Sequence, residues 1–404
     1  MPATEFAIQN ASTLGIRTQR LSILEDLIQN YMAKDYRQAI VIKITKGGDA
    51  IFEGCYGTNT KAYGVKPDTI FQVASVTKPV VATLLMMLQE DGLVDLYEPV
   101  STYLPEFTGG GRENIQLWHF LTHTSSLRYE DMQPYIDEIC VKEYRLLPPK
   151  EGSPPEEWQA FRRLACEKMG LDPDAINDRL NDPEYLVSLK IPIKHAPRSN
   201  MAYCNYGYQR LKEIIDVVTG EPIDTTAQKR LFDPLGMKDT YWSVPEEKWG
   251  RILGRKEVCE GAAWLNSTGS YQDESGAGGL KTTVDDITNF CRMILGGGVF
   301  HGERLLSRRS VAEMARNHNA GVASDGNLAF GAWGLGWNIK MDKQDDTGIL
   351  RSSRCLDHGG WAGTKILIDP EEGITAAIFT AEYKPGINKN IYAPVMNVLY
   401  SALE

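Results

Sequence analysis

Residues 74–92 read ASVTKPVVATLLMMLQEDG, and this stretch decides the fold. Its residues 79–89 are apolar nearly all round, which predicts a helix that is buried on every side. Gly92 is a natural C-terminal stop for that helix. Proline is tolerated only in the first turn of a helix, so Pro79 predicts that Ser75 lies at or just before the N-terminus.

Ser75 and Lys78 stand one helical turn apart and face the same way. A lysine drawn under an apolar wall loses hydration, and this desolvation lowers the pKa of its ammonium group. A serine hydroxyl becomes a good nucleophile when a base takes its proton, which a buried lysine can do. The unpaired N–H groups of the helix end stabilise negative charge that develops nearby. A plainer interpretation also fits, in which Ser75 caps the helix and Lys78 extends to solvent.

The two ends of the chain predict strands. Residues 39–44 and 50–56 are β-rich runs separated by a Lys-Gly-Gly-Asp turn, which is a hairpin signal. Residues 364–368 and 374–379 repeat this pattern around a second turn near the C-terminus. Apolar residues at helical spacing predict helices at 19–34, 209–219, 283–295 and 392–403.

Strands at both ends with helices between them predict an α/β (α+β) fold, an antiparallel sheet from both termini with an inserted, mostly helical lobe. We expect residues 1–95 and 270–404 to form the sheet lobe and residues 96–269 the helical lobe. Within the helical lobe, residues 128–198 are rich in charge and proline, with a helical patch at 156–169. Such a segment is typical of a lid over a binding site, although a solvated surface excursion fits equally.

Composition excludes several classes of partner. The 404 residues carry a formal net charge of −10 without a long run of Lys and Arg, so no nucleic-acid partner is expected. No stretch of about 18 apolar residues and no secretory signal is visible, so we expect no membrane span. The seven cysteines are odd in number and lack CxxC spacing, which favours reduced thiols in a cytoplasmic protein. We expect no cofactor, and the oligomeric state stays open.

Two further clusters lie far along the chain. Tyr203-Cys204-Asn205 precedes a helix, and a phenol beside a lysine can act as a base, although a buried aromatic ring is the commoner role. Asp357-His358-Gly359-Gly360-Trp361 precedes the strand expected at 364–368. Paired glycines let the backbone approach a ligand closely and leave N–H groups free to face an oxyanion. Alone, these glycines also fit an ordinary turn.

The sequences SVTK (75–78), YCN (203–205) and HGG (358–360), in this order and spacing, resemble the motifs of the serine β-lactamase-related family. That family includes class C β-lactamases, D-alanyl-D-alanine peptidases, family VIII carboxylesterases and acyltransferases of statin biosynthesis. The resemblance implies the serine β-lactamase/transpeptidase-like fold from about residue 20 to the C-terminus. Further stretches fit the family framework: FQVA (71–74), LTHTS (121–125), FDPLGM (232–237), GAGGL (276–280) and WAGT (361–364).

Carried over residue by residue, the resemblance implies that Ser75 is the acylated nucleophile and Lys78 its proton partner. Tyr203 takes the place of the general base for acylation and deacylation. The backbone N–H groups of Ser75 and Trp361 would form the oxyanion hole. The positions implied to bind substrate are Asn205, His358, Gly359 and Gly360. His123, in the LTHTS stretch, takes the place of a structural turn and receives no catalytic role.

The main departure from the family lies on the strand beside the serine. The β-lactamases and peptidases carry Lys-Thr-Gly there, and this chain has His358-Gly359-Gly360. A lysine holds a firm positive charge for a substrate carboxylate, whereas a histidine near its ordinary pKa of about 6.5 does so only in part. We therefore expect a carboxylesterase that acts on small neutral esters through a Ser75 acyl-enzyme. The alternatives are an acyltransferase with the same acyl-enzyme, a β-lactamase and a D-alanyl-D-alanine peptidase.

Other classes of protein fit the sequence less well. The GxSxG signature of nucleophile-elbow hydrolases does not occur in the chain. His119 and His123 have the spacing of zinc ligands, but Phe120 stands where a HEXXH motif has Glu, so no metal site is expected. A catalytically silent binding or assembly protein with the same fold is the rival from another class. The intact set of Ser, Lys and Tyr argues against it.

Overall fold

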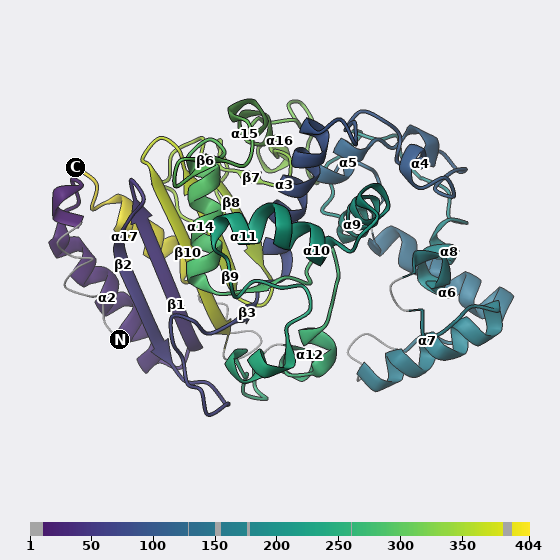
Figure 1. Ribbon diagram of the computed structural model, residues 1–404, viewed down its shortest axis with the longest axis horizontal. Coiled ribbons are helices and arrows are strands. Elements are labelled where there is room, and N and C mark those ends of the chain that lie inside the picture. Colours follow the sequence, from purple (N-terminus) through teal and green to yellow (C-terminus); the bar gives the residue numbers. More distant parts are fainter. Residues whose placement is uncertain (1–10, 128, 150–154, 176–177, 260, 383–389) are drawn as a thin grey trace.

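The computed structural model describes residues 11–127, 129–149, 155–175, 178–259, 261–382 and 390–404 (Figure 1). Its main sheet has six antiparallel strands in the order β2-β1-β10-β9-β8-β7. The strands are β1 (Arg37–Lys46), β2 (Asp49–Gly57), β7 (Asn338–Ile339), β8 (Leu356–Gly360), β9 (Thr364–Asp369) and β10 (Ile374–Glu382). Because β1 pairs with β10, the two ends of the chain meet inside one sheet. The predicted sheet from both termini is therefore confirmed.

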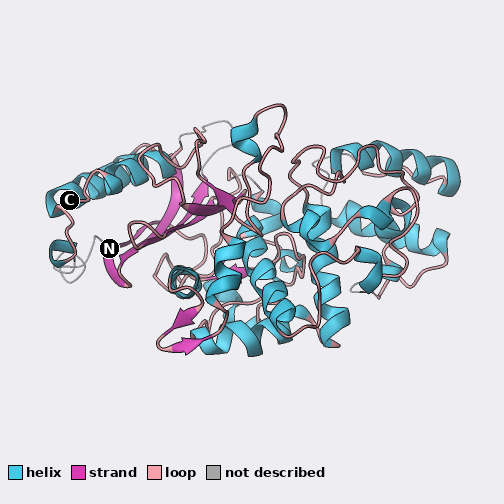
Figure 2. Ribbon diagram, turned by 90° about the horizontal axis from the view of Figure 1, so that it is seen from above, coloured by secondary structure: helices cyan, strands magenta, loops and turns pink. Residues whose placement is uncertain are grey.

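Helices cover both faces of this sheet. Alternate residues of β1 point to opposite sides, and Ile40 and Ile42 pack against α2 (Thr18–Ala33) and α17 (Tyr392–Tyr400). Val41 points the other way, into the main core beneath α14 (Val284–Leu295). Figures 1 and 2 show the sheet between these two layers. The helices predicted at both ends of the chain are confirmed, although the last one ends at Tyr400.

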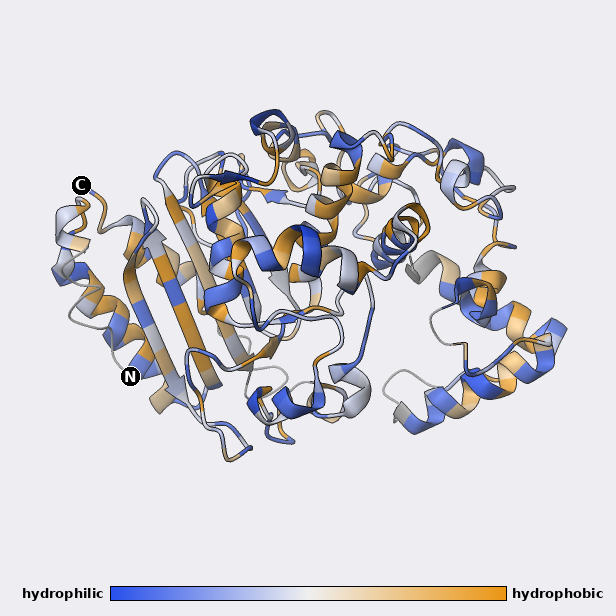
Figure 3. Ribbon diagram, in the orientation of Figure 1, coloured by the Kyte–Doolittle hydropathy of each residue, from blue (hydrophilic) through white to orange (hydrophobic). Residues whose placement is uncertain are grey.

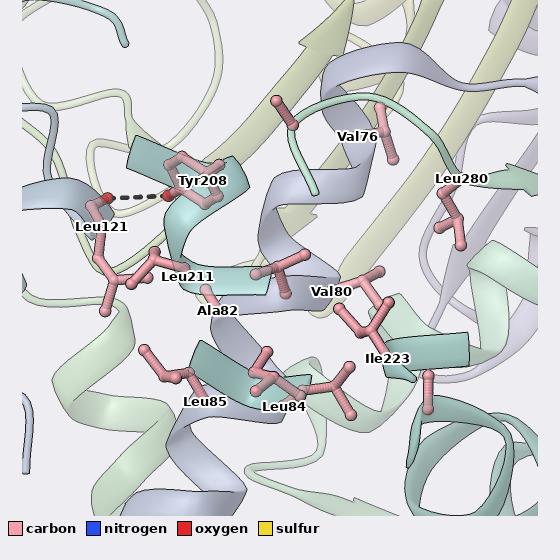
Figure 4. Close-up of a cluster of buried hydrophobic side chains, with 14 of the residues drawn as sticks. Val76, Val80, Ala82, Leu84, Leu85, Leu121, Tyr208, Leu211, Ile223 and Leu280 are labelled. Carbon is pink, nitrogen blue, oxygen red and sulfur yellow. Dashed lines mark hydrogen bonds between the residues drawn. The ribbon is translucent and has the colours of Figure 1, made fainter. Parts of the chain in front are cut away.

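Helix α3 (Thr77–Glu90) is the central element of the main core, and all its residues from 77 to 88 are buried. Val80, Ala82 and Leu84 lie among apolar side chains of neighbouring elements, including Leu211 of α9 (Asn205–Thr219) (Figure 4). A helix with apolar residues all round is stable only where packing surrounds it, which explains its position between the sheet and the helical part. The predicted buried helix is confirmed.

The inserted part between β2 and β8 is mostly helical. Its segment 129–198 holds α6 (Tyr129–Tyr144), α7 (Pro155–Met169) and α8 (Pro183–Ser188), with α6 and α7 at the end of the molecule away from the sheet (Figure 1). Apolar residues follow the strands and the inner sides of the helices, whereas α7 is largely hydrophilic (Figure 3). The lobe boundaries 1–95, 96–269 and 270–404 stay a prediction.

The remaining helices are short: α4 (Val100–Tyr103), α5 (Leu117–Leu121), α10 (Ile223–Ala227), α11 (Asp233–Leu235), α12 (Ala262–Leu265), α13 (Thr268–Tyr271), α15 (Arg308–Met314) and α16 (Leu328–Gly331). Within the described residues, no helix has both the length and the apolar character that crossing a bilayer requires.

Candidate active site

Ser75 lies in a single 3₁₀ turn, Ala74–Val76, that leads directly into α3. Ala74 has φ of 47°, a left-handed conformation that residues with a side chain rarely adopt and that is common at functional sites. The Thr77 hydroxyl donates a hydrogen bond to the Ala74 carbonyl at 2.7 Å and accepts one from the Leu280 N–H at 3.0 Å. These two bonds hold the serine turn in a fixed position at the head of the helix.

Lys78 is fully buried one turn after the serine. Its Nζ donates hydrogen bonds to Ser75 Oγ at 2.9 Å and to the Ala277 carbonyl at 2.7 Å. Burial lowers the pKa of this ammonium group to about 7, while the nearby Cys204 thiol acts in the opposite direction. The predicted desolvation of Lys78 is confirmed. The plainer interpretation is wrong, because Ser75 makes no capping hydrogen bond and Lys78 does not reach solvent.

Tyr203 lies just before α9, and its ring faces Lys78. The Lys78 Nζ is 4.8 Å from the ring centroid. Although 40% of Tyr203 is exposed, its phenol group is buried. Burial raises the pKa of the phenol well above its usual 10, and a hydrogen bond with Ser75 counteracts part of that rise. Ser75, Lys78 and Tyr203 therefore come together as the motifs implied, with Tyr203 protonated at neutral pH.

His123 holds the segment that carries Tyr203 from both sides. Its carbonyl accepts a hydrogen bond from the Ala202 N–H at 2.8 Å, and its Nδ1 accepts one from the Cys204 N–H at 3.0 Å. The imidazole also packs on the Tyr203 ring, with 4.3 Å between the centroids. Burial, followed by the charge of Lys78, holds the pKa of His123 well below its usual range, so the ring stays neutral. The resemblance implied that His123 belongs to a structural turn and has no catalytic role. Its contacts show that it also supports Tyr203.

The histidine-glycine-glycine segment lies in a strand of its own, β8, which pairs with β9 from Leu356 to Gly360. A turn was one interpretation of these glycines, and the structure shows that it is wrong. Gly360 lies so near the serine turn that an added Cβ would be 2.2 Å from the Val73 carbonyl oxygen. The Thr364 hydroxyl donates a hydrogen bond to the same oxygen at 2.9 Å. Only glycine permits this close approach of β8 to the turn that carries Ser75.

The oxyanion hole expected from the N–H groups of Ser75 and Trp361 is compatible with this arrangement. In the loops, turns and caps that the structure describes, neither N–H donates a hydrogen bond to a backbone carbonyl. Both residues line the same cavity, although the Trp361 side chain is 53% exposed. Both N–H groups are therefore available to a ligand, and the oxyanion hole that they would form stays a prediction.

His358 is buried, and its ionisation differs from the expectation. Its Nδ1 lies 3.0 Å from the Gly359 carbonyl, which can only accept, so Nδ1 carries the proton and Nε2 is an acceptor. Burial, followed by the charge of Lys78, lowers the pKa of His358 to about 3. A partial positive charge near an ordinary pKa was therefore the wrong expectation. The imidazole is neutral at physiological pH, and its buried Nε2 has no hydrogen-bond partner among the described residues.

Two separate cavities lie beside these residues. The smaller, of about 230 Å³, is lined by Ser75, Asn205 and Trp361, and the larger, of about 500 Å³, is lined by Tyr203 and His358. Asn205 is exposed at the start of α9 and makes no hydrogen bond to Lys78 in the described part of the chain. No described residue of 129–198 lines either cavity, so a lid role for this segment stays a prediction.

The two histidines with zinc spacing are engaged elsewhere. The Nδ1 of His119 accepts a hydrogen bond from the Gln116 N–H at 3.0 Å, and that of His123 binds the Cys204 N–H. Among the residues that the structure describes, no group of three or more His, Cys, Asp or Glu side chains could hold a metal ion.

Gly360→Ala tests the close approach of β8. The new methyl group would meet backbone at 2.2 Å, so β8 and the serine turn must separate. We expect kcat for a p-nitrophenyl ester to fall about 10²-fold, since misplacement of about 1 Å has an effect of that size. Gly250→Ala is the control for the glycine-to-alanine change itself, because an added Cβ there would meet nothing within 4 Å. Equal activity of the two variants would contradict this account of β8.

Comparison with known proteins identifies the family of this chain. The family model described as Beta-lactamase matches residues 24–392. The chain is 25% identical to N-acetylmuramyl-L-alanine amidase of Bacillus subtilis (strain 168), over 98% of this chain and 92% of the relative. It is 24% identical to esterase EstB of Burkholderia gladioli, over 89% of each chain. The solved structure of EstCE1, a hydrolase with promiscuous acyltransferase activity, aligns with a TM-score of 0.69 and 18% identity, over 95% of this chain and 99% of that one. The resemblance and the fold are thus confirmed, and the chain belongs to the beta-lactamase family, which includes serine hydrolases such as esterases and peptidases.

Proposed function

We propose that this protein is a serine hydrolase that works through a Ser75 acyl-enzyme and acts as a carboxylesterase. The observation that carries the proposal is the buried pair in which Lys78 Nζ lies 2.9 Å from Ser75 Oγ. With a pKa of about 7, a substantial fraction of Lys78 is neutral at physiological pH and can accept a proton. An activated serine that lines a cavity is the arrangement that acyl transfer requires.

In the first step, Ser75 Oγ bonds to the ester carbonyl carbon while its proton moves to Lys78 Nζ. The carbonyl oxygen takes the negative charge and faces the N–H groups of Ser75 and Trp361. The resemblance implied Tyr203 as the first base, but its raised pKa keeps the phenol protonated in the resting enzyme. Lys78 is the better acceptor, because it contacts the serine directly and has the lower pKa.

In the second half of acylation, the bond between the carbonyl carbon and the leaving oxygen breaks. The leaving alkoxide takes a proton from the Tyr203 hydroxyl, which Lys78 then reprotonates. In deacylation, water bonds to the acyl carbon and gives a proton to Tyr203, which passes its own proton to Lys78. The bond between the acyl carbon and Ser75 Oγ then breaks, Lys78 returns the proton to Ser75, and the acid is released. A bound alcohol in place of water would give the acyltransferase alternative, and the larger cavity beside Tyr203 has room for one.

The substrate class follows from the charge beside the scissile bond. The strand position where β-lactamases and peptidases of the family carry lysine holds neutral His358 here. A carboxylate next to the scissile bond needs a positively charged partner and would find an uncharged hydrogen-bond acceptor there. A neutral ester needs no positively charged partner. The similarity to an esterase supports this choice. The β-lactamase and D-alanyl-D-alanine peptidase alternatives are correspondingly weaker.

Ser75→Ala tests the nucleophile. The substitution removes one hydroxyl and little packing, so the fold should stay intact while ester turnover falls by several orders of magnitude. Intact-mass spectrometry should show an acyl adduct with a slow ester on the wild-type protein and none on the variant. Ser126→Ala, at a serine that lines neither cavity, is the control. Near-wild-type turnover by Ser75→Ala would refute the acyl-enzyme.

The pH dependence tests the assignment of the base. Lys78 accepts a proton only when it is neutral, so kcat/KM should be low in acid, rise about tenfold per pH unit and level off above about pH 7. Tyr203→Phe should keep this midpoint and lower the rate by about 10²–10⁴-fold, as expected for the loss of a proton-transfer group. A midpoint that moves in Tyr203→Phe would return the role of first base to Tyr203.

A panel of acyl donors tests the substrate class. We expect efficient hydrolysis of p-nitrophenyl acetate and weak turnover of penicillins and cephalosporins, whose carboxylate finds no cation at His358. His358→Lys should improve β-lactam acylation relative to ester hydrolysis, and His358→Gln, which stays neutral, should not. A wild-type kcat/KM for a cephalosporin equal to that for the best ester would overturn this assignment.

A further inference from the structure

The larger cavity extends away from the reacting serine. Tyr203 and His358 line it, while Ser75 lines the smaller cavity instead. Two aromatic side chains, Phe330 and Trp333, form part of its wall. In an ester bound at Ser75 with its leaving oxygen beside Tyr203, the rest of the leaving group would extend into this space.

Lys343 lies on the wall of this cavity and is only 2% exposed. Its ammonium donates hydrogen bonds to the Ala332 carbonyl at 2.5 Å and to Asn338 Oδ1, and it lies 5.4 Å from the Trp333 ring centroid. These partners are neutral, and an ammonium group has three N–H donors. Among its described contacts Lys343 has no carboxylate partner, so one donor and the positive charge remain for a ligand.

The carboxylates near Lys343 already have cationic partners. Asp357 accepts a hydrogen bond from Arg351 Nη1 at 2.6 Å and lies 3.6 Å from Lys365 Nζ. Asp345 binds the other terminal nitrogen of the same arginine, whose side chain is wholly buried. Lys365 Nζ also donates a hydrogen bond to Asp346 Oδ1 at 3.0 Å, so Arg351 and Lys365 together serve three carboxylates. Lys343 supplies a further positive charge to the cavity wall.

Two other charged residues border this region. Asp325 lines the cavity in the segment before α16. Lys340 is buried behind the wall, where its ammonium donates hydrogen bonds to the carbonyls of Met341 and Lys343, and it does not line the cavity. Lys340 is therefore a natural control for the charge of its neighbour.

We propose that Lys343 binds an acidic group on the leaving-group side of the substrate. An acid directly beside the scissile bond would meet neutral His358, so the acid must be held away from that bond by a spacer. Phe330 and Trp333 suit an aromatic spacer, because flat rings pack well on aromatic side chains. The inference rests on the proposed acyl-enzyme and refines its substrate class: esters that are neutral at the acyl group and carry a carboxylate at the far end of an aryl leaving group.

The charge on Lys343 also depends on pH. Burial lowers the pKa of its ammonium to about 8, opposed by Asp357 and Asp345 and reinforced by Arg351 and Lys340. A lysine with this pKa is charged at neutral pH and loses its charge as the pH rises through about 8. Preference for an acidic leaving group should therefore be strong at pH 7 and decline above pH 8.

The test compares 4-carboxyphenyl acetate with 4-carbamoylphenyl acetate, a neutral ester of nearly the same size. We expect Lys343→Met to lower kcat/KM for the carboxy ester about tenfold to a hundredfold, mainly through KM, as for loss of a charged hydrogen bond. Activity on the carbamoyl ester should stay within about twofold, because this ester has no charge for Lys343 to bind. That retained activity would also show that the variant is folded. Lys343→Arg should retain the preference, and Lys340→Met should affect both esters equally.

Binding of the product phenols separates this inference from the proposed function. Calorimetry should show that wild-type protein binds 4-hydroxybenzoate more tightly than 4-hydroxybenzamide, and that Lys343→Met abolishes the difference. This measurement needs no turnover, so it tests the subsite even if neither ester is hydrolysed. Equal binding of the two phenols by wild-type protein, or an equal effect of Lys343→Met on both esters, would overturn the proposal.

Discussion

The ammonium group of Lys78 is buried in the first turn of α3 without a carboxylate partner among the described residues, and the proposed chemistry of the site depends on this arrangement. Its pKa falls from 10.5 to about 7, a shift worth roughly 5 kcal/mol between its charged and neutral forms. The partners that remain are the Ala277 carbonyl, Ser75 Oγ and the rings of Tyr203 and Tyr208. The apolar surroundings that bury α3 in the core therefore also lower the pKa of the proposed base.

The other ionisable groups of the site are shifted away from neutrality by the same burial. The pKa values of His123 and His358 fall, and Lys78 contributes to both shifts, while the pKa of Tyr203 rises. Of these four groups, only Lys78 has a pKa near neutral pH. In the proposed mechanism, Lys78 is therefore the one of these four groups that accepts the Ser75 proton at the start of the reaction. The absence of charge on the two imidazoles also suits a neutral acyl group.

Much of the fold was predictable from the sequence because its signals are local. The all-round apolar pattern after Pro79, the hairpin at 39–56 and the paired strands at 364–379 each depend on neighbouring residues, and all appear in the structure. β8 was harder to recognise, since Gly359 and Gly360 have low strand propensity and become a strand through pairing with β9. The conformation of β8 is therefore determined by its pairing with β9 and not by its local sequence.

The catalytic motifs located the site, but three of its properties depend on distant parts of the chain. The low pKa of His358 comes from burial and from Lys78, 280 positions earlier in the sequence. The support that His123 gives Tyr203 requires two backbone contacts with a distant segment. Lys343 carries no motif, and it becomes notable only because the fold places it on a cavity wall beyond Tyr203. The spacing of motifs along the sequence does not reveal the pKa of His358, the contacts of His123 or the position of Lys343.

The most direct measurement is the pKa of Lys78 itself, obtained by nuclear magnetic resonance titration of the protein labelled with ¹³C at lysine Cε. Lys78→Arg, which lacks the labelled group, identifies the signal. The account predicts a titration midpoint at about pH 7, set by burial without a counter-ion. A midpoint near the ordinary lysine value of about 10.4 would contradict it, because Lys78 would then be charged throughout the working range and unable to take the serine proton.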